Sequence, residues 1–167
     1  IISEMFGCEI KFRKDSSPQV ITRNITDEEA DKIEPIILLQ NETFRELKKL
    51  VEQLKERFGY VVGDINWQGV LNVALDLRGE NIFIDMIQNQ TRARRIFGAI
   101  TQTIKEFVTY VKSETGTSSI SVNRTIVFVN PGLNLHSNCS VMMISPEMYQ
   151  SLLLEYDLEL ARTCQPY

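Results

Sequence analysis

The sequence predicts an α/β protein in which a mainly parallel sheet is covered by long amphipathic helices. Short apolar runs rich in β-branched residues, such as YVVGDINW (60–67), alternate along the chain with long segments of helical periodicity. Turn-forming residues separate these segments, for example Gly59 and the Pro131-Gly132 pair. Long helices between short strands are typical of βαβ units, whose strands run parallel.

The first 40 residues are expected to form an irregular lead-in that contains short strands. CEIKFR (8–13) and QVITR (19–23) are strand-like, and KDSSP separates them. A helix is predicted in TDEEADKI (26–33), because Thr26 and Glu29 have the spacing of a capping box. With 167 residues, the whole chain is predicted to be a single domain.

The βα units are predicted over residues 41–167. Apolar residues at intervals of three and four predict long helices over 42–58 and 90–113, and a glycine follows each of them. A last helix is predicted to begin at Pro146, with Ser145 as its N-cap. The residues expected on the buried faces of these three helices are Phe44, Leu47, Val51, Leu54 and Phe58; Ile96, Ile100, Ile104, Phe107 and Val111; and Tyr149, Leu152, Leu153, Tyr156 and Leu160.

Shorter elements are predicted between the long helices. GVLNVALDL (69–77) is a loop or a short helix, and a further short helix is expected near 79–87. TSSISVN (117–123), TIVFV (125–129) and LNLHSNC (133–139) are strand-like, and the last of them is a candidate for a buried strand.

Charge and composition argue against several classes of function. A net charge of −4 and a pI near 5.1 argue against binding to nucleic acid or to an anionic membrane surface. No apolar run approaches the roughly 20 residues of a membrane span. Cys8, Cys139 and Cys164 form no CxxC pair, which favours reduced thiols and a cytoplasmic location. Two of the five glycosylation sequons, at Asn41 and Asn89, fall where helix N-caps are expected, so capping is the favoured interpretation of these residues.

Polar loops after the strands are the predicted functional site, because ligands of α/β folds bind at the carboxyl ends of strands. Three loops qualify: GDINWQG, SVNRT and LHSNCSVMMIS. In the first, Asp64 is a general base, a recognition carboxylate or a turn residue, and Trp67, the only tryptophan, is a ligand contact or a core anchor. In the second, Arg124 suits recognition of a carboxylate or phosphate, or makes a surface salt bridge.

His136 and Cys139 raise the question of a metal site. They supply two ligands at most, whereas a zinc site takes three or four from the protein. In a continuous strand, His136, Asn138 and Ser140 point to one face and Cys139 points to the other. Only a bulge or a turn after Ser137 brings His136 and Cys139 together, and a hydrogen-bonded histidine near a pocket is the favoured interpretation.

Two segments of the sequence carry a resemblance to a known family. GVLNVALDLRGENIFIDMIQNQTRARRIFGAITQTIKEFV and CSVMMISPEMYQSLLLEYDLELA together cover most of residues 58–163. The first resembles the Gly-led segment, acidic stretch and long helix of the uroporphyrinogen decarboxylase-like superfamily, and the second resembles its Ser-Pro-Glu-x-Tyr helix. The resemblance implies a (β/α)8 TIM barrel, of which this chain, which lacks an initiator Met, would hold a central portion.

The superfamily includes two chemistries. Its decarboxylases remove acetate carboxyls from uroporphyrinogen, in porphyrin biosynthesis, without a cofactor. Its corrinoid-linked methyltransferases use zinc, held by a His-x-Cys and a later Cys, to activate a thiol. Here the decarboxylase tyrosine falls near Leu75 and its serine falls on Cys139, which favours methyl transfer linked to a corrinoid (cobalamin). The His-x-Cys would lie beyond Tyr167 in a longer protein. Decarboxylation of uroporphyrinogen and a non-catalytic tetrapyrrole- or corrinoid-binding module are the alternatives.

On these grounds Asp64, His136 and Cys139 are predicted to be catalytic, and His136 and Cys139 are the only candidate metal ligands. The expected partners are a small-molecule tetrapyrrole or methyl donor, a corrinoid protein and a second copy of the chain. Zinc and a corrinoid are the expected cofactors of the full-length protein. The predicted substrate-binding residues are Asn66, Trp67, Gln68, Asn72, Asn123, Arg124, Asn138 and Ser140.

Overall fold

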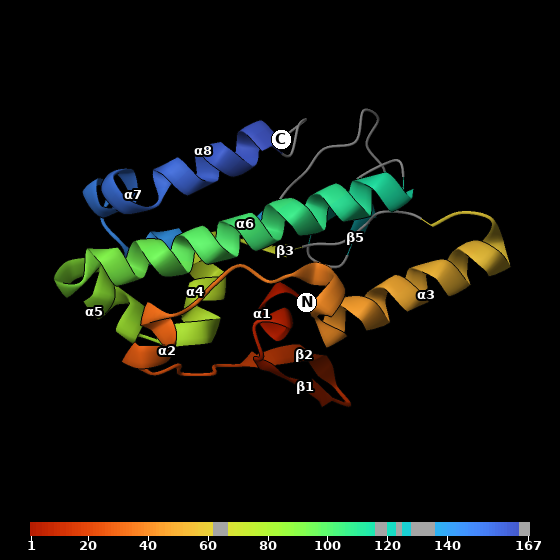
Figure 1. Ribbon diagram of the computed structural model, residues 1–167, viewed down its shortest axis with the longest axis horizontal. Helices are drawn as coiled ribbons and strands as arrows, with labels where there is room; N and C mark the ends of the chain where they lie inside the picture. Colours follow the sequence, from red (N-terminus) through yellow and green to blue (C-terminus); the bar gives the residue numbers. More distant parts are fainter. Residues whose placement is uncertain (62–66, 116–119, 123–124, 128–135, 164–167) are drawn as a thin grey trace.

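The structure, a computed structural model, is mainly helical (Figure 1). It describes residues 1–61, 67–115, 120–122, 125–127 and 136–163. The α-helices are α1 (Ile2–Met5), α2 (Asp27–Asp31), α3 (Glu42–Phe58), α4 (Val70–Arg78), α5 (Asn81–Gln88), α6 (Gln90–Thr115), α7 (Pro146–Leu152) and α8 (Leu154–Thr163). Two 3-10 helices are η1 (Leu38–Gln40) and η2 (Cys139–Met143).

The described strands form three separate sheets of two strands each. Two of the sheets are antiparallel hairpins and the third is a short parallel pair. The hairpins are β1 (Glu9–Arg13) with β2 (Ser16–Ile21) and β4 (Ile120–Val122) with β5 (Thr125–Val127), and the parallel pair is β3 (Trp67–Gln68) with β6 (His136–Ser137).

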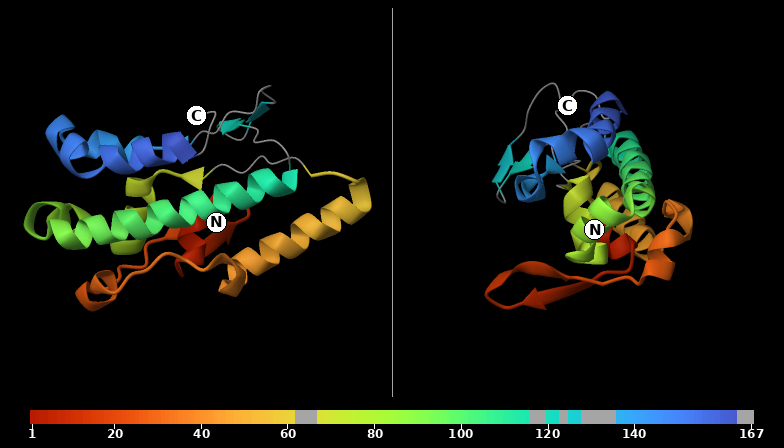
Figure 2. Two further views of the ribbon diagram at one scale, coloured as in Figure 1. Left: turned by 45° about the horizontal axis from the view of Figure 1, so that its top comes forward. Right: turned by 90° about the vertical axis from the view of Figure 1, so that its left-hand side faces the viewer.

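The core is built around α6, which crosses the middle of the molecule in Figure 1. Helices α4, α5 and α8 all pack against it, and both views of Figure 2 show α8 alongside it. The apolar residues predicted on one face of α6 are all buried, as that periodicity requires. The fully buried side chains of the core include Leu71 and Leu77 from α4, Ile82 from α5, Ile96, Phe97, Ile100, Ile104 and Phe107 from α6, and Leu152 from α7.

The predicted fold class is therefore correct only in part. Among the described residues the parallel β3–β6 pair is too short to form a mainly parallel sheet, and no clear barrel is present. The apolar faces of the helices pack on one another, with α6 at the centre, instead of covering a broad sheet. Of the strand predicted over 60–67, Trp67 belongs to β3, whereas Tyr60 lies outside any strand and is 69% exposed; residues 62–66 lie outside the described residues.

Helix boundaries follow the predicted capping signals closely. Thr26 opens α2 with a complete capping box, and Asn41 caps α3. Asn89 accepts a hydrogen bond from the backbone N–H of Arg92 in the first turn of α6. Ser145 caps α7, which confirms the predicted start of the last helix, although that helix is interrupted and continues as α8. These caps confirm the local reading of the sequence at each helix start.

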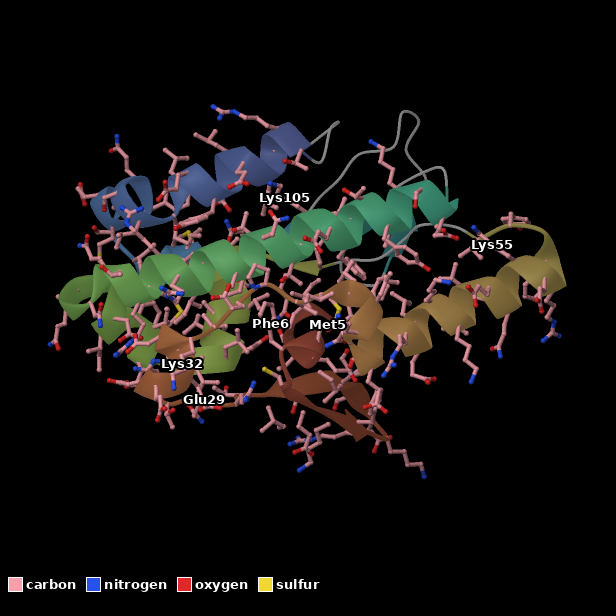
Figure 3. The ribbon with its side chains drawn as sticks, viewed as in Figure 1. Met5, Phe6, Glu29, Lys32, Lys55 and Lys105 are labelled. Carbon is pink, nitrogen blue, oxygen red and sulfur yellow. The ribbon has the colours of Figure 1, made fainter. Side chains whose placement is uncertain are left out.

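The buried residues of helix α3 do not extend beyond Val51. Phe44 and Val51 are buried, whereas Phe58, predicted on the same buried face, is 56% exposed. The end of α3 extends past the end of α6 in Figure 1, so it has no helix to cover it there. An ion pair of 2.6 Å joins Lys55 of α3 to Glu114 near the end of α6 (Figure 3).

A cluster of charged side chains links α2, α4, α5 and α6. Arg78 and Asp85, both buried, form an ion pair with a distance of 2.8 Å between Nε and Oδ2. Arg78 also pairs with Asp27, and Arg92 pairs with Asp27, Asp85 and Asp31. The pKa of Asp27 lies below its ordinary value, chiefly because the carboxylate accepts a hydrogen bond from Arg78. The cluster ties α2 to three consecutive helices, α4, α5 and α6, that are distant from it in the sequence.

Within the described part of the chain, none of the helices has the length and apolarity needed to cross a bilayer.

Candidate functional site at the ends of β3 and β6

The parallel strands β3 and β6 end side by side, and their ends come unusually close together. Trp67 pairs with His136 and Gln68 with Ser137. Directly after β3, the backbone N–H of Gly69 donates to the carbonyl oxygen of Ser137 over 2.6 Å. A Cβ atom on Gly69 would lie 2.4 Å from Asn138 Oδ1, so only glycine fits this approach without displacing its neighbours. The junction brings the start of α4 next to the start of η2.

A buried amide connects the two chain segments beyond this junction. Asn72, in the first turn of α4, is only 9% exposed. Its Nδ2 donates to Cys139 Sγ over 3.3 Å, and its Oδ1 accepts from the backbone N–H of Ser140 over 3.1 Å. Cys139 itself is exposed. These two hydrogen bonds fix the orientation of the Asn72 amide. One of them also holds the accessible thiol of Cys139, just beyond the end of β6.

A second polar group lies behind Asn138. The side-chain amide of Asn138 donates to Asp157 Oδ2 over 2.9 Å, and the hydroxyl of Tyr149 donates to the same oxygen over 2.7 Å. Burial, reinforced by this hydrogen bond, raises the pKa of Tyr149 to about 12. Asp157, which lies in α8, thus binds both Asn138 and the hydroxyl of Tyr149 in α7. Asp157 was not among the predicted site residues. The available signal in the sequence was a carboxylate next to the predicted buried face of the last helix, since such a group needs a hydrogen-bonding partner.

Gln68 and Trp67 belong to the strand that leads into the junction. The amide of Gln68 donates to Asp76 Oδ2 over 2.9 Å, and the hydroxyl of buried Ser3 lies 2.6 Å from the same oxygen and 2.9 Å from Gln68 Oε1. Gln68 therefore ties α1 to α4. Trp67 is 7% exposed, and its Nε1 has no hydrogen-bond partner among the described residues.

Several predicted site residues cannot be placed in this geometry. Asp64, Asn66, Asn123 and Arg124 lie outside the described residues. Of His136 only the backbone is described, paired with Trp67. The structure brings together the remaining predicted residues Asn72, Asn138, Cys139 and Ser140 around the ends of β3 and β6.

The strand predicted over 133–139 ends earlier than expected; residues 133–135 lie outside the described residues. It ends at Ser137, and Cys139 begins the 3-10 helix η2, so the strand alternation that set His136 and Cys139 on opposite faces does not apply at Cys139. Among the described residues, no three His, Cys, Asp or Glu side chains converge as metal ligands.

The two cysteines of the described region differ in environment. Cys8 is buried, which raises the pKa of its thiol to about 11, and Asp76 adds to this shift. Cys139 is exposed. Of these two cysteines, Cys139 at the strand ends therefore has an accessible thiol, whereas Cys8 beside α1 does not.

Cavities in the described region lie elsewhere. One of about 720 Å³ is lined by α1 and α3, including Glu4, Glu46 and Leu50. Another, of about 500 Å³, lies around Met5, Phe6 and Lys32, which Figure 3 labels. The strand-end residues line neither of the two.

The comparisons with known proteins identify a fold but not a family. No family model matches the sequence, and no curated protein matches it. Among solved structures, the chain is similar to a methyltransferase from Methanosarcina mazei, with a TM-score of 0.71 and 16% sequence identity. The match covers 98% of this chain and 46% of that protein, so the chain spans less than half of its length. The chain therefore shares its fold with part of that protein. Membership of the uroporphyrinogen decarboxylase-like superfamily stays a prediction.

Proposed function

We propose that this chain forms part of a methyltransferase, with corrinoid-linked methyl transfer as its reaction and the ends of β3 and β6 as one wall of its substrate site. The observation that carries this proposal is the likeness of nearly the whole chain to a methyltransferase fold. The position of the polar residues supports it, because ligands bind beyond the carboxyl ends of parallel strands in α/β folds.

The residues at the junction have roles that fit their environment. Asn72, Asn138 and the backbone of Ser140 supply amide groups that can hydrogen-bond the polar parts of a substrate. Cys139, accessible and oriented by Asn72, is the residue that would lie against the reacting methyl group or thiol. Asp157 acts behind them as a positioning residue, since it fixes Asn138 without lying at the surface of the junction.

A corrinoid, when bound, supplies a methyl group that leaves as an electrophile and that a thiolate can accept. The described residues do not supply the three ligands that a zinc ion would need, so no step of the proposal is assigned to zinc. What this chain contributes is hydrogen bonding and orientation at the strand ends.

The experiment is a methyl-transfer assay on the protein in the length that its gene encodes, since this chain spans less than half of the similar protein. Methylcobalamin and an excess of a simple thiol are the substrates. The sulfur–carbon bond forms as the cobalt–carbon bond breaks, the electron pair stays on cobalt, and the thiol proton goes to solvent. Loss of the methyl–cobalt absorbance reports the rate.

Two variants and one control locate the site. Asn72→Ala and Cys139→Ser are each expected to lower the rate about tenfold or more, which corresponds to the loss of one hydrogen bond or contact in the transition state. The exposed Ser151, whose hydroxyl bonds only the carbonyl of Met148, provides the control variant Ser151→Ala, with an unchanged rate. Binding of the corrinoid without turnover would favour the non-catalytic module. Release of carbon dioxide from uroporphyrinogen would favour decarboxylation.

A further inference from the structure

The β1–β2 hairpin projects from the helical body, against which Val20 packs, and both of its edges are free among the described residues. It lies at the bottom of the molecule in Figure 1 and projects sideways in the right-hand view of Figure 2. Its strands pair only with each other among the described residues, and β1 makes no backbone hydrogen bond to another described element. Phe12, next to the end of β1, is 77% exposed. Free strand edges are places where another chain can add a strand.

The two edges differ in their capacity to pair. The register passes from Lys11 opposite Gln19 to Arg13 opposite Ser16, so the single residue Phe12 faces two residues of β2, Ser17 and Pro18. The extra residue of this bulge therefore lies on β2. Proline has no N–H to donate, and a bulge interrupts regular pairing, so both features protect the edge of β2. β1 has neither feature, and its free edge is the regular one.

The sequence of β1, EIKFR, is complementary to itself in the antiparallel direction. When two copies are related by a twofold axis at Lys11, Glu9 lies opposite Arg13 and Ile10 lies opposite Phe12, and each pair occurs twice. Opposite charges and aromatic–aliphatic pairs stabilise neighbouring strands, whereas the single Lys11–Lys11 pair at the axis is unfavourable. This register uses every residue of the strand, with four favourable pairs against one unfavourable pair.

The faces of the hairpin agree with this arrangement. Because β1 is not bulged, Ile10 and Phe12 share one face, and Val20 of β2 lies directly opposite Ile10. Pairing through β1 would join two hairpins into a four-stranded sheet with the Ile10, Phe12 and Val20 side chains of both copies on one face. The exposed Phe12 would then gain apolar neighbours. Neither Glu9 nor Arg13 has an ion-pair partner among the described residues, so both charges are available.

We propose that β1 is a dimerisation surface on which a second copy of this chain adds its own β1 in antiparallel pairing about Lys11. The charge pattern favours a second copy as the partner. The same strand, running in the opposite direction, places Arg13 opposite Glu9 and Glu9 opposite Arg13. The contact is small, well below the roughly 1,200 Å² of stable protein complexes, so the dimer forms at high protein concentration.

The test is sedimentation equilibrium of the full-length protein over a wide range of concentrations. Glu9→Arg and Arg13→Glu each place like charges in both ion pairs, and each is expected to weaken dimerisation about tenfold or more. The double variant Glu9→Arg/Arg13→Glu restores both pairs in the same register and should dimerise like the wild type. Because these side chains are exposed, the variants should fold normally, and circular dichroism verifies this.

A mixing experiment gives a second readout. The Glu9→Arg and Arg13→Glu proteins repel themselves but attract each other, so an equimolar mixture should form heterodimers that native mass spectrometry can distinguish. A protein that stays monomeric at all concentrations would overturn the proposal. A dimer whose affinity is indifferent to these charge reversals would overturn it as well, because its interface would lie elsewhere.

Discussion

At the end of β3, the absence of a side chain on Gly69 allows the two parallel strands to meet. Its φ is −65°, so the requirement is for space and not for a left-handed backbone. A methyl group there would lie 2.4 Å from Asn138 Oδ1 and 2.9 Å from the carbonyl oxygen of Ser137. Its partner, Asn138, is far away in the chain, so the sequence alone could not identify this contact.

Gly69→Ala should destabilise the protein by about 1–3 kcal/mol, the usual cost of overpacking. Gly98→Ala is the matched control, because a Cβ there meets its first atom, Tyr156 Cε1, at 4.0 Å, and alanine is favoured inside a helix. That control should leave stability unchanged or raise it by up to about 1 kcal/mol. Urea unfolding of both variants provides the comparison, and equal stabilities would contradict the close approach of the two strands.

Tyr149 predicts a dependence of stability on pH. Its pKa is raised from 10.0 to about 12 by burial and by the hydrogen bond to Asp157, which means that folding favours the neutral phenol. The stabilisation is therefore complete below pH 10 and is lost as the pH rises towards 12.

Tyr149→Phe removes this ionisation. In an absorbance titration of tyrosinate, the variant should lack one late-ionising tyrosine, and its stability should fall less than that of the wild type between pH 10 and 12. If the absorbance lost in the variant falls near pH 10 instead, Tyr149 ionises at its ordinary pH, and that result would contradict its buried hydrogen bond to Asp157.

At the scale of elements, the helices and the hairpin strands were predictable from the sequence, since β1, β2, β4 and β5 all overlap segments expected to be strands, whereas the pairing of the strands was not. Helix starts depend on local signals, such as Asn41 and Ser145, and apolar spacing over 26 residues in α6 leaves little ambiguity. The described part of each strand in the parallel pair has two residues, too few for an alternation to be recognised. The strand expected over 60–67 is an example. An apolar run of that length can be a buried strand or an exposed segment, and Tyr60 is exposed.

The charged cluster between helices predicts a large difference between two ion pairs. Asp85→Ala leaves Arg78, whose side chain is 6% exposed, buried with its main partner removed, and should cost about 3–5 kcal/mol. Glu28→Ala removes an exposed pair with Lys32 and should cost about 0–1 kcal/mol. Thermal unfolding measures both, and similar costs would mean that Arg78 finds water or another partner. The sequence could not predict this cluster, because Arg78 and Asp27 are separated by 51 positions.

For the whole molecule, the same apolar faces that predicted a sheet covered by helices proved to pack helix against helix. Periodicity identifies which face of a helix is buried but not what covers it, and this is why a parallel sheet was expected and α6 is found at the centre. The polar residues predicted at the strand ends were more informative about the site than the apolar faces were about the fold. They drew attention to Asn72 and Cys139, which lie 67 positions apart and share a hydrogen bond, although the direction of that bond required the structure.

The central claim is that the ends of β3 and β6 form part of a methyl-transfer site. The most direct measurement is the rate of methyl transfer from methylcobalamin to a thiol by the full-length Asn72→Ala protein, relative to the Ser151→Ala control. A rate about tenfold or more below that of the control, in a variant that stays folded, is the predicted result. Equal rates in the two variants, or no transfer by the wild type, would contradict the claim.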